Sequence, residues 1–84
     1  MDDKFNEELK RIKKSIPELV GKRIKELRES KGISQVDLAY KIGSDRQYLY
    51  KIESAKVNVS MVKLAIIANA LDITLEEFFS KVIL

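Results

Sequence analysis

The sequence predicts an all-α fold. Apolar residues recur at helical spacing along most of the 84 residues, and no segment alternates apolar and polar residues with the period of two that marks a half-buried strand. One proline and three glycines leave few places where a helix has to end. Together these observations predict a five-helix domain at residues 17–84, preceded by an additional N-terminal amphipathic helix at residues 1–16.

The additional helix has one apolar face, because its apolar residues follow the spacing i, i+4, i+7, i+11. These residues are Phe5, Leu9, Ile12 and Ile16. Residues 15–17 are expected to break the helix, since proline fits the first turn of a helix better than its middle. We expect the apolar face to pack over the domain, with a domain-swapped dimer contact as the alternative. The basic run at residues 10–14 is expected to form a solvated face, and the alternative is an approach to DNA.

The second helix is expected at residues 17–31, with Val20, Ile24 and Leu27 facing inward. Gly32 then lies where a left-handed C-terminal cap ends a helix.

Two short helices joined by a glycine turn come next. Ser34 is a natural N-cap for a helix that ends at residue 42, and Asp45 for a helix that ends at residue 53. Gly43 between them supplies the positive φ of a tight turn. The residues expected to face inward are Leu38, Ala39, Ile42, Leu49 and Ile52.

A loop and two helices complete the chain. Residues 54–59 show no periodic pattern and are expected to form the loop. Ser60 caps a helix that ends at residue 71, while Thr74 and Glu77 have the spacing of a capping box and start a last helix through Phe79. The inward-facing residues of the helix at 60–71 are expected to be Met61, Leu64, Ala65, Ala68 and Leu71.

The composition argues against an enzyme and for an anionic partner. The chain has no histidine and no cysteine, which removes the usual zinc ligands, thiolate nucleophiles and the commonest general base. It also has no glycine-rich phosphate loop, so we expect no catalytic residues, no metal and no cofactor. The net charge is +3, and the excess of basic residues lies in residues 19–59. Without an apolar run long enough for a membrane span, a cytoplasmic protein is expected.

Residues 19–79 resemble the Cro/repressor-type helix-turn-helix domain, the XRE family of bacterial regulators. The matching segments are GKRIKELRESKGISQVDLAYKIG, YLYKIE and LAIIANALDITLEEFF, in which apolar, glycine and glutamine positions match together. Within the family, LAYKIGSDRQYLYKIE is most similar to the controller proteins of restriction-modification systems. Departures are Ser44 in place of an apolar residue, SAK after Glu53 in place of an arginine-glycine pair, and NVS in place of a proline before the serine.

The resemblance implies a sequence-specific transcription regulator, a repressor for example, that binds double-stranded operator DNA as a homodimer. Helix 34–42 would lie across the DNA backbone, and helix 45–53 would enter the major groove. Base contacts are expected from Arg46, which suits guanine, from Gln47, which suits adenine, and from Tyr50. Phosphate contacts are expected from Ser34, Gln35, Tyr48, Lys51, Lys56, Asn58 and Ser60. The alternatives are a merely solvated face for Arg46 and Gln47, and half-buried packing for Tyr48.

The remaining expectations concern helix packing and assembly. The resemblance implies an ion pair between Arg28 and Glu53 that holds the recognition helix in place. A two-fold dimer is expected through apolar residues near the C-terminal end, with Ile67 as a further candidate. The alternative is that Ile67 and Val82 complete the core and that Leu84 frays. The dimer residues are expected to be Val62, Ile66, Phe79, Val82, Ile83 and Leu84. The rival function is a protein-interaction module built on the same frame, such as an antitoxin.

Overall fold

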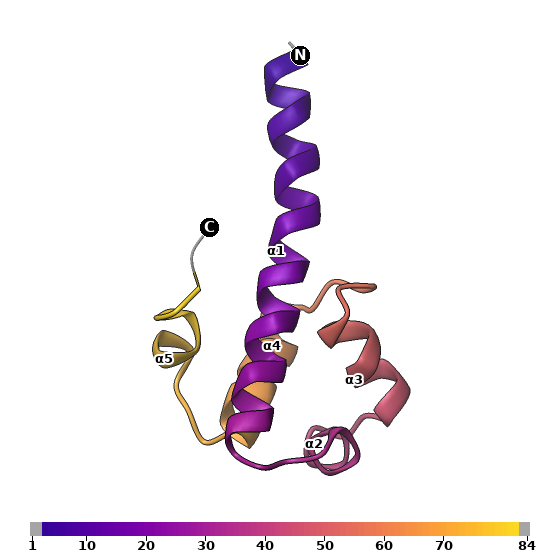
Figure 1. Ribbon diagram of the computed structural model, residues 1–84, viewed down its shortest axis with the longest axis vertical. Helices are drawn as coiled ribbons and strands as arrows, with labels where there is room; N and C mark the ends of the chain where they lie inside the picture. The colour runs from indigo at the N-terminus through magenta and orange to yellow at the C-terminus, as the bar shows by residue number, and fades with distance from the viewer. Residues whose placement is uncertain (1–2, 83–84) are drawn as a thin grey trace.

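In a computed structural model that describes residues 3–82, these residues form five helices and no strand (Figure 1). The predicted all-α fold class is confirmed. The helices are α1 (Asp3–Ser30), α2 (Gln35–Lys41), α3 (Arg46–Glu53), α4 (Met61–Ala70) and α5 (Leu75–Phe79). None of the helices in this part of the chain is both long and apolar enough to cross a membrane.

The first helix is longer than predicted. The expected break at residues 15–17 is wrong, because α1 continues through Pro17 for 28 residues. Proline removes one backbone hydrogen bond, and the helix-forming residues on both sides of it keep the rest of the ladder. The division of the chain at residue 16 therefore coincides with no helix end, and that division stays a prediction. A helix of this length spans about 42 Å, close to the longest dimension of the molecule, 45 Å.

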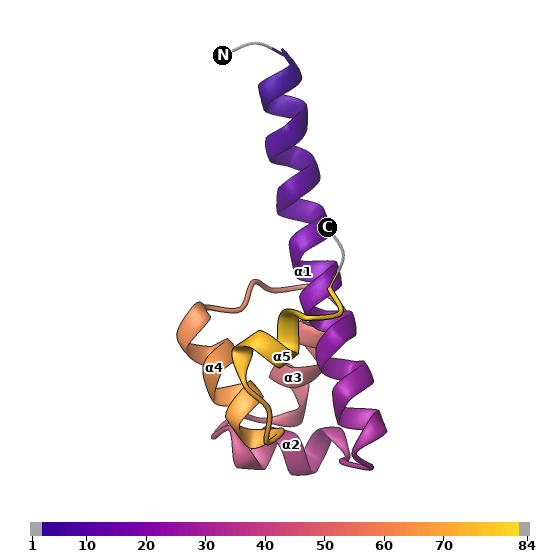
Figure 2. The same cartoon turned by 90° about the vertical axis from the view of Figure 1, so that its left-hand side faces the viewer.

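The N-terminal half of α1 extends beyond the other helices (Figures 1 and 2). Phe5 and Ile12 are about half exposed there, so the expectation that this apolar face packs over the domain is wrong for both residues. Only the C-terminal end of this apolar face approaches the domain, and Ile16 is partly buried there. The helix continues straight past the place where a break would have folded it back.

The predicted N-caps of α2 to α5 are confirmed. In each of the four helices the side-chain oxygen of the N-cap residue accepts a hydrogen bond from the backbone N–H three residues later, at 2.7 to 3.1 Å. The four residues are Ser34, Asp45, Ser60 and Thr74. Because such a cap contributes about 1 kcal/mol, these four residues determine where short helices begin.

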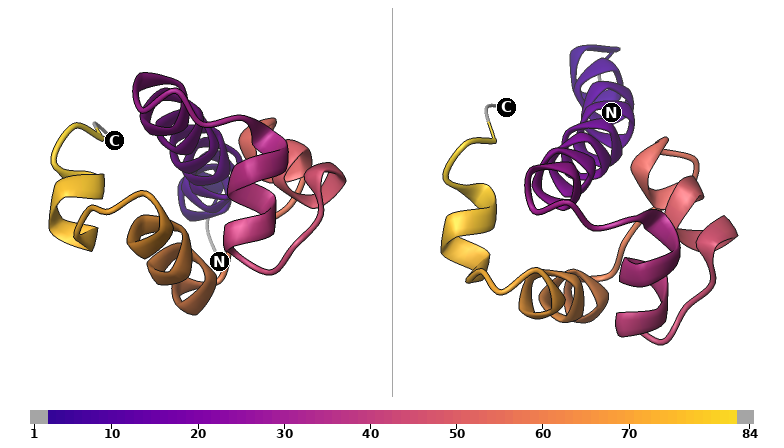
Figure 3. Two further views of the ribbon diagram at one scale, coloured as in Figure 1. Left: turned by 90° about the horizontal axis from the view of Figure 1, so that it is seen from below. Right: turned by 60° about the horizontal axis from the view of Figure 1, so that its bottom comes forward.

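Helices α2 to α5 form an arc along one side of the C-terminal half of α1 and enclose one core with it (Figure 3). The core residues are Ile24, Leu38, Ala39, Ile42, Leu49, Ile52, Leu64, Ile67, Ala68, Leu71 and Phe78. In α4 the predicted face is partly wrong, since Ile67 is fully buried whereas Met61 and Ala65 are exposed. This helix is apolar on nearly every side, so periodicity alone does not select the side that packs on its neighbours.

Candidate nucleic-acid interface

Helices α2 and α3 pack together as a helix-turn-helix unit. Gly43 occupies the turn with φ of +69°, a conformation that glycine adopts without steric cost. The next residue, Ser44, donates its backbone N–H to the carbonyl of Ala39 at 2.9 Å. Leu38 from α2 and Leu49 from α3 are fully buried in the same cluster. The two helices are therefore fixed relative to each other by the core.

The outer face of α3 carries the side chains predicted to read bases. Leu49 and Ile52 are buried, which leaves Arg46, Gln47 and Tyr50 exposed on the opposite side of the helix. Their spacing places them within the first turns of α3, where a recognition helix contacts base edges. These planar, donor-bearing side chains are chemically suited to the major groove. Within residues 3–82 no cluster of three or more His, Cys, Asp or Glu side chains is placed to hold a metal ion.

Most of the predicted phosphate-contacting residues are exposed around α3. They are Ser34, Lys51, Lys56, Asn58 and Ser60. Lys56 Nζ lies 5.4 Å from the centroid of the Tyr50 ring, so the loop after α3 brings a positive charge beside the exposed face of α3. The hydroxyls of Ser34 and Ser60 accept the capping hydrogen bonds. Each hydroxyl keeps its own O–H as a donor for a phosphate oxygen.

Tyr48 differs from these residues because it is partly buried and packs against the core. Lys63 Nζ lies 5.6 Å from the centroid of the Tyr48 ring and donates to the carbonyl of Ile42 at 3.3 Å. Lys63 thus ties α4 to the end of α2. This role of Lys63 is not predictable from the sequence, since its partners are far from it along the chain and no local pattern indicates them.

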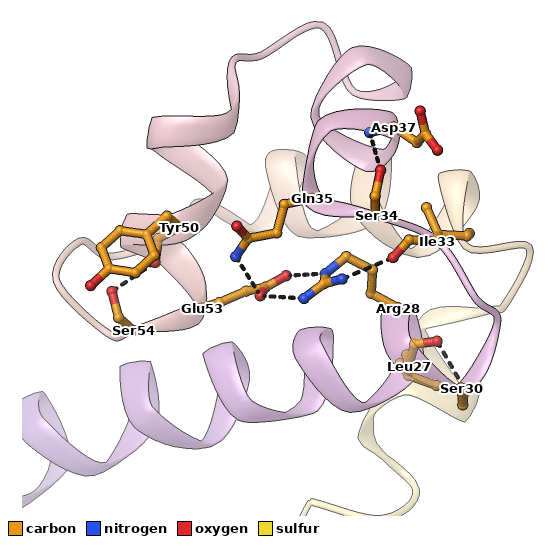
Figure 4. A network of polar contacts seen from close by, with 10 residues as sticks. All are labelled: Leu27, Arg28, Ser30, Ile33, Ser34, Gln35, Asp37, Tyr50, Glu53 and Ser54. Atoms are coloured by element: carbon orange, nitrogen blue, oxygen red, sulfur yellow. Dashed lines mark hydrogen bonds and ion pairs between the residues drawn. The ribbon is translucent and has the colours of Figure 1, made fainter.

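A buried polar network holds the C-terminal end of α3 (Figure 4). Arg28 and Glu53 form a two-point ion pair, with Nε to Oε2 at 2.8 Å and Nη2 to Oε1 at 3.1 Å, and their side chains are only 10% and 3% exposed. Arg28 also donates to the carbonyl of Ile33 at 2.8 Å. The hydrogen bond to Glu53 raises the pKa of the Arg28 guanidinium above its ordinary value, so the guanidinium stays charged.

Gln35 belongs to the same network, which the sequence analysis did not predict. Its Nε2 donates to Glu53 Oε1 at 3.1 Å, as Figure 4 shows. A primary amide has two N–H donors, so one remains for a phosphate oxygen. The first residue of α2 is in this way linked to the last residue of α3.

The backbone of α1 lies directly against the end of α3 at Gly21. A Cβ atom at this position would lie 2.4 Å from the carbonyl oxygen of Ile52 and 2.9 Å from that of Glu53. The glycine therefore sets how closely the two helices approach. Just beyond α3, Ala55 takes a positive φ of 62°, a left-handed conformation that glycine adopts without steric cost.

The candidate dimer residues lie on α4 and α5 and after them. Val62 is 72% exposed, Ile66 42% and Phe79 39%, and Val82 is partly exposed. Ile83 and Leu84 lie outside the described residues. The structure thus leaves several large apolar side chains of this region on the surface, and their contact with a second copy stays a prediction.

Comparisons with known proteins agree with this arrangement. Residues 24–78 match the helix-turn-helix family HTH_3. The control protein C.MunI of Mycoplasma sp is 44% identical over 63 residues, which are 74% of this chain and 85% of that protein.

Two solved structures of restriction-modification controller proteins are also similar. C.AhdI from Aeromonas hydrophila superposes with a TM-score of 0.71 at 43% identity, covering 75% of this chain and 96% of its own. The C.Esp1396I tetramer, solved with its natural 35 base-pair operator, gives a TM-score of 0.76 at 34% identity and covers 81% of this chain and 90% of its own. With a match over more than half of its length, this chain belongs to the helix-turn-helix family.

Proposed function

We propose that this chain is a sequence-specific DNA-binding transcriptional regulator that binds an operator as a homodimer, with α3 in the major groove. The single observation that carries the proposal is the exposure of Arg46, Gln47 and Tyr50 on one face of a helix whose other face is locked in the core. The similarity to controller proteins, one of them solved on its operator, supports the same function.

The proposed docking separates base contacts from phosphate contacts. Arg46 binds O6 and N7 of a guanine, Gln47 binds N6 and N7 of an adenine, and Tyr50 contacts the adjacent base or its methyl group. Around them the five exposed phosphate-contacting residues, together with the second N–H of Gln35 and the hydroxyl of Tyr48, fix the register of α3 on the duplex.

A single unit of this size reads few base pairs, so specific binding requires two half-sites about 34 Å apart. We propose that the exposed apolar residues of α4 and α5 join two copies across a two-fold axis. The proposed role is regulatory and not enzymatic, in agreement with relatives that are named controller proteins. It requires the protein to share a compartment with DNA, which is the cytoplasm in bacteria.

The test is a selection of bound duplexes from a randomised DNA pool. It is run on the wild type, on Arg46→Ala/Gln47→Ala, and on Lys31→Ala/Asn69→Ala as a matched control. Both double variants lose one positive charge and one amide, but the control residues are exposed outside α3, Lys31 in the turn directly after α1 and Asn69 on α4. We expect the wild type and the control to enrich the same two-fold symmetric site. The α3 variant should lose discrimination at the contacted positions by about 1–3 kcal/mol each.

Either failure of this selection is informative. If the wild type enriches no sequence even at low salt, where phosphate contacts are strongest, the regulator function is refuted and the protein-interaction alternative gains support. If both double variants enrich the wild-type site equally well, the operator function stands, but base reading by Arg46 and Gln47 is wrong.

A further inference from the structure

The N-terminal arm, residues 3–16 of α1, carries an apolar stripe made of Phe5, Leu9, Ile12 and Ile16. Ile12 is 48% exposed, Phe5 is half exposed, and Leu9 and Ile16 are partly exposed. The arm extends beyond the other helices in both side views (Figures 1 and 2). A helix that is apolar on one side and polar on the other normally buries the apolar side against another surface.

The lower end of the stripe opens into a groove of about 320 Å³ between α1, the loop after α3, α4 and α5. Its lining includes Ile12 and Ile16 from the arm, Met61 from α4 and Phe79 from α5. Met61 is 64% exposed, and Phe79 belongs to the proposed dimer face. The apolar stripe and the dimer face are therefore parts of one continuous apolar surface.

Spacing and charge favour a second copy of this chain as the occupant. The intervals of four, three and four residues along the stripe are those of a seam between paired helices. Glu8 lies on one edge of the stripe, in an exposed ion pair with Arg11 of its own helix, and Lys13 lies on the other edge. When two copies of the stripe pack in parallel, each Glu8 lies beside the Lys13 of the other copy, so the surface complements itself electrostatically.

The small size of the α4–α5 face also favours a second copy of this chain as the partner of the arm. A stable interface of standard size buries about 800 Å² from each partner, contributed by roughly 20–30 residues. The described part of the α4–α5 face offers few large apolar contacts, which are Met61, Val62, Ile66, Phe79 and Val82. The arm adds four more apolar side chains along a helix that already borders this face.

We propose that the N-terminal arm is a dimerisation element, whose apolar stripe packs against the second copy in continuity with the α4–α5 face. This inference rests on the proposed homodimer and adds the surface that stabilises it. DNA does not suit the stripe, because a phosphate backbone selects basic groups, whereas the side chains of the stripe are all apolar.

The test compares the dimer dissociation constants of three full-length proteins by sedimentation over a dilution series. They are the wild type, Leu9→Ser/Ile12→Ser on the stripe, and Glu7→Ser/Lys10→Ser on the opposite face of the arm. Both double variants keep the net charge and place two serines three residues apart in the same helix turns. We expect the stripe variant to raise the dissociation constant on the order of 10- to 100-fold, from two large apolar side chains lost to the interface. The control should stay within about threefold.

A second stripe variant, Leu9→Ala/Ile12→Ala, keeps helix propensity high and should weaken the dimer in the same direction. If all variants dimerise like the wild type, the arm inference is overturned, while the homodimer and its operator stand. If the wild type is a monomer at every concentration, the homodimer is overturned together with the arm inference. The DNA selection is read separately, so it still decides whether the monomer recognises a sequence.

Discussion

The contact between α1 and the end of α3 gives the sharpest prediction, the substitution Gly21→Ala. In the middle of a helix, alanine is ordinarily better than glycine by about 1 kcal/mol. Helix propensity alone therefore predicts a more stable protein. The packing predicts the opposite, because the added Cβ would lie 2.4 Å from the carbonyl oxygen of Ile52.

The magnitude follows from that distance. An unstrained contact between a carbon and a carbonyl oxygen is about 3.3 Å or longer, so the two helices must separate by about 0.9 Å. The obstacle is backbone, and no side-chain rotation removes it. Overpacking typically costs about 1–3 kcal/mol, and a clash with backbone lies in the upper part of that range, about 2–3 kcal/mol, because no side chain can move to relieve it. After the gain in propensity, the free energy of unfolding should fall by roughly 1–2 kcal/mol, which corresponds to a drop in Tm of roughly 5–15 °C for a chain of this size.

The assay is thermal and urea unfolding followed by circular dichroism, with the neighbouring residue as the control. Lys22 is exposed in the same turn of α1. The difference between Lys22→Ala and Lys22→Gly measures the propensity term alone, and the alanine variant should be the more stable by about 1 kcal/mol. If Gly21→Ala is as stable as the wild type, or more stable, the close approach of α1 to α3 does not limit the packing and the reasoning is refuted.

Two further substitutions test the end of α3. Glu53→Ala leaves Arg28 as an unpaired buried charge, so this substitution should lower the free energy of unfolding by about 3–5 kcal/mol. We expect it to weaken operator binding only indirectly, through this loss of stability. Lost binding with an unchanged melting temperature would show that Glu53 takes part in DNA binding directly. Ala55→Gly removes the steric cost of a left-handed conformation at φ of 62°. Urea unfolding should therefore show a free energy of unfolding that is higher by about 0.5–1 kcal/mol. A lower free energy of unfolding would mean that the Ala55 side chain packs favourably.

The features that depend on a few neighbouring residues were predictable from the sequence. Helix starts at Ser34, Asp45, Ser60 and Thr74 follow from side chains that cap the backbone three residues later, which is a local interaction. The outward face of α3 followed from the inward positions of Leu49 and Ile52. The Arg28–Glu53 pair came from the family resemblance, because 25 residues separate the partners and no local pattern joins them.

The errors arose where local rules leave two outcomes open. Pro17 is compatible with either the start of a helix or a position inside one. The helix continues through it because residues 16–24 pack on the domain as one helical segment. In α4, the choice between Ile67 and Met61 as a core residue depends on where α5 lies. The closeness of Gly21 to Ile52 depends on the placement of two helices, so a single sequence does not indicate it.

The structure of α1 links the two proposed interfaces mechanically. One uninterrupted helix carries the arm stripe at its N-terminal end and contacts the end of α3 through Gly21 and Arg28 at its C-terminal half. A dimer contact at the arm would therefore orient α3 as well as hold the two copies together. Because half-sites about 34 Å apart admit only one separation of the recognition helices, a shift of α1 against α3 would weaken operator binding even where the dimer is intact. Gly21→Ala should thus reduce affinity for a full operator more than for an isolated half-site.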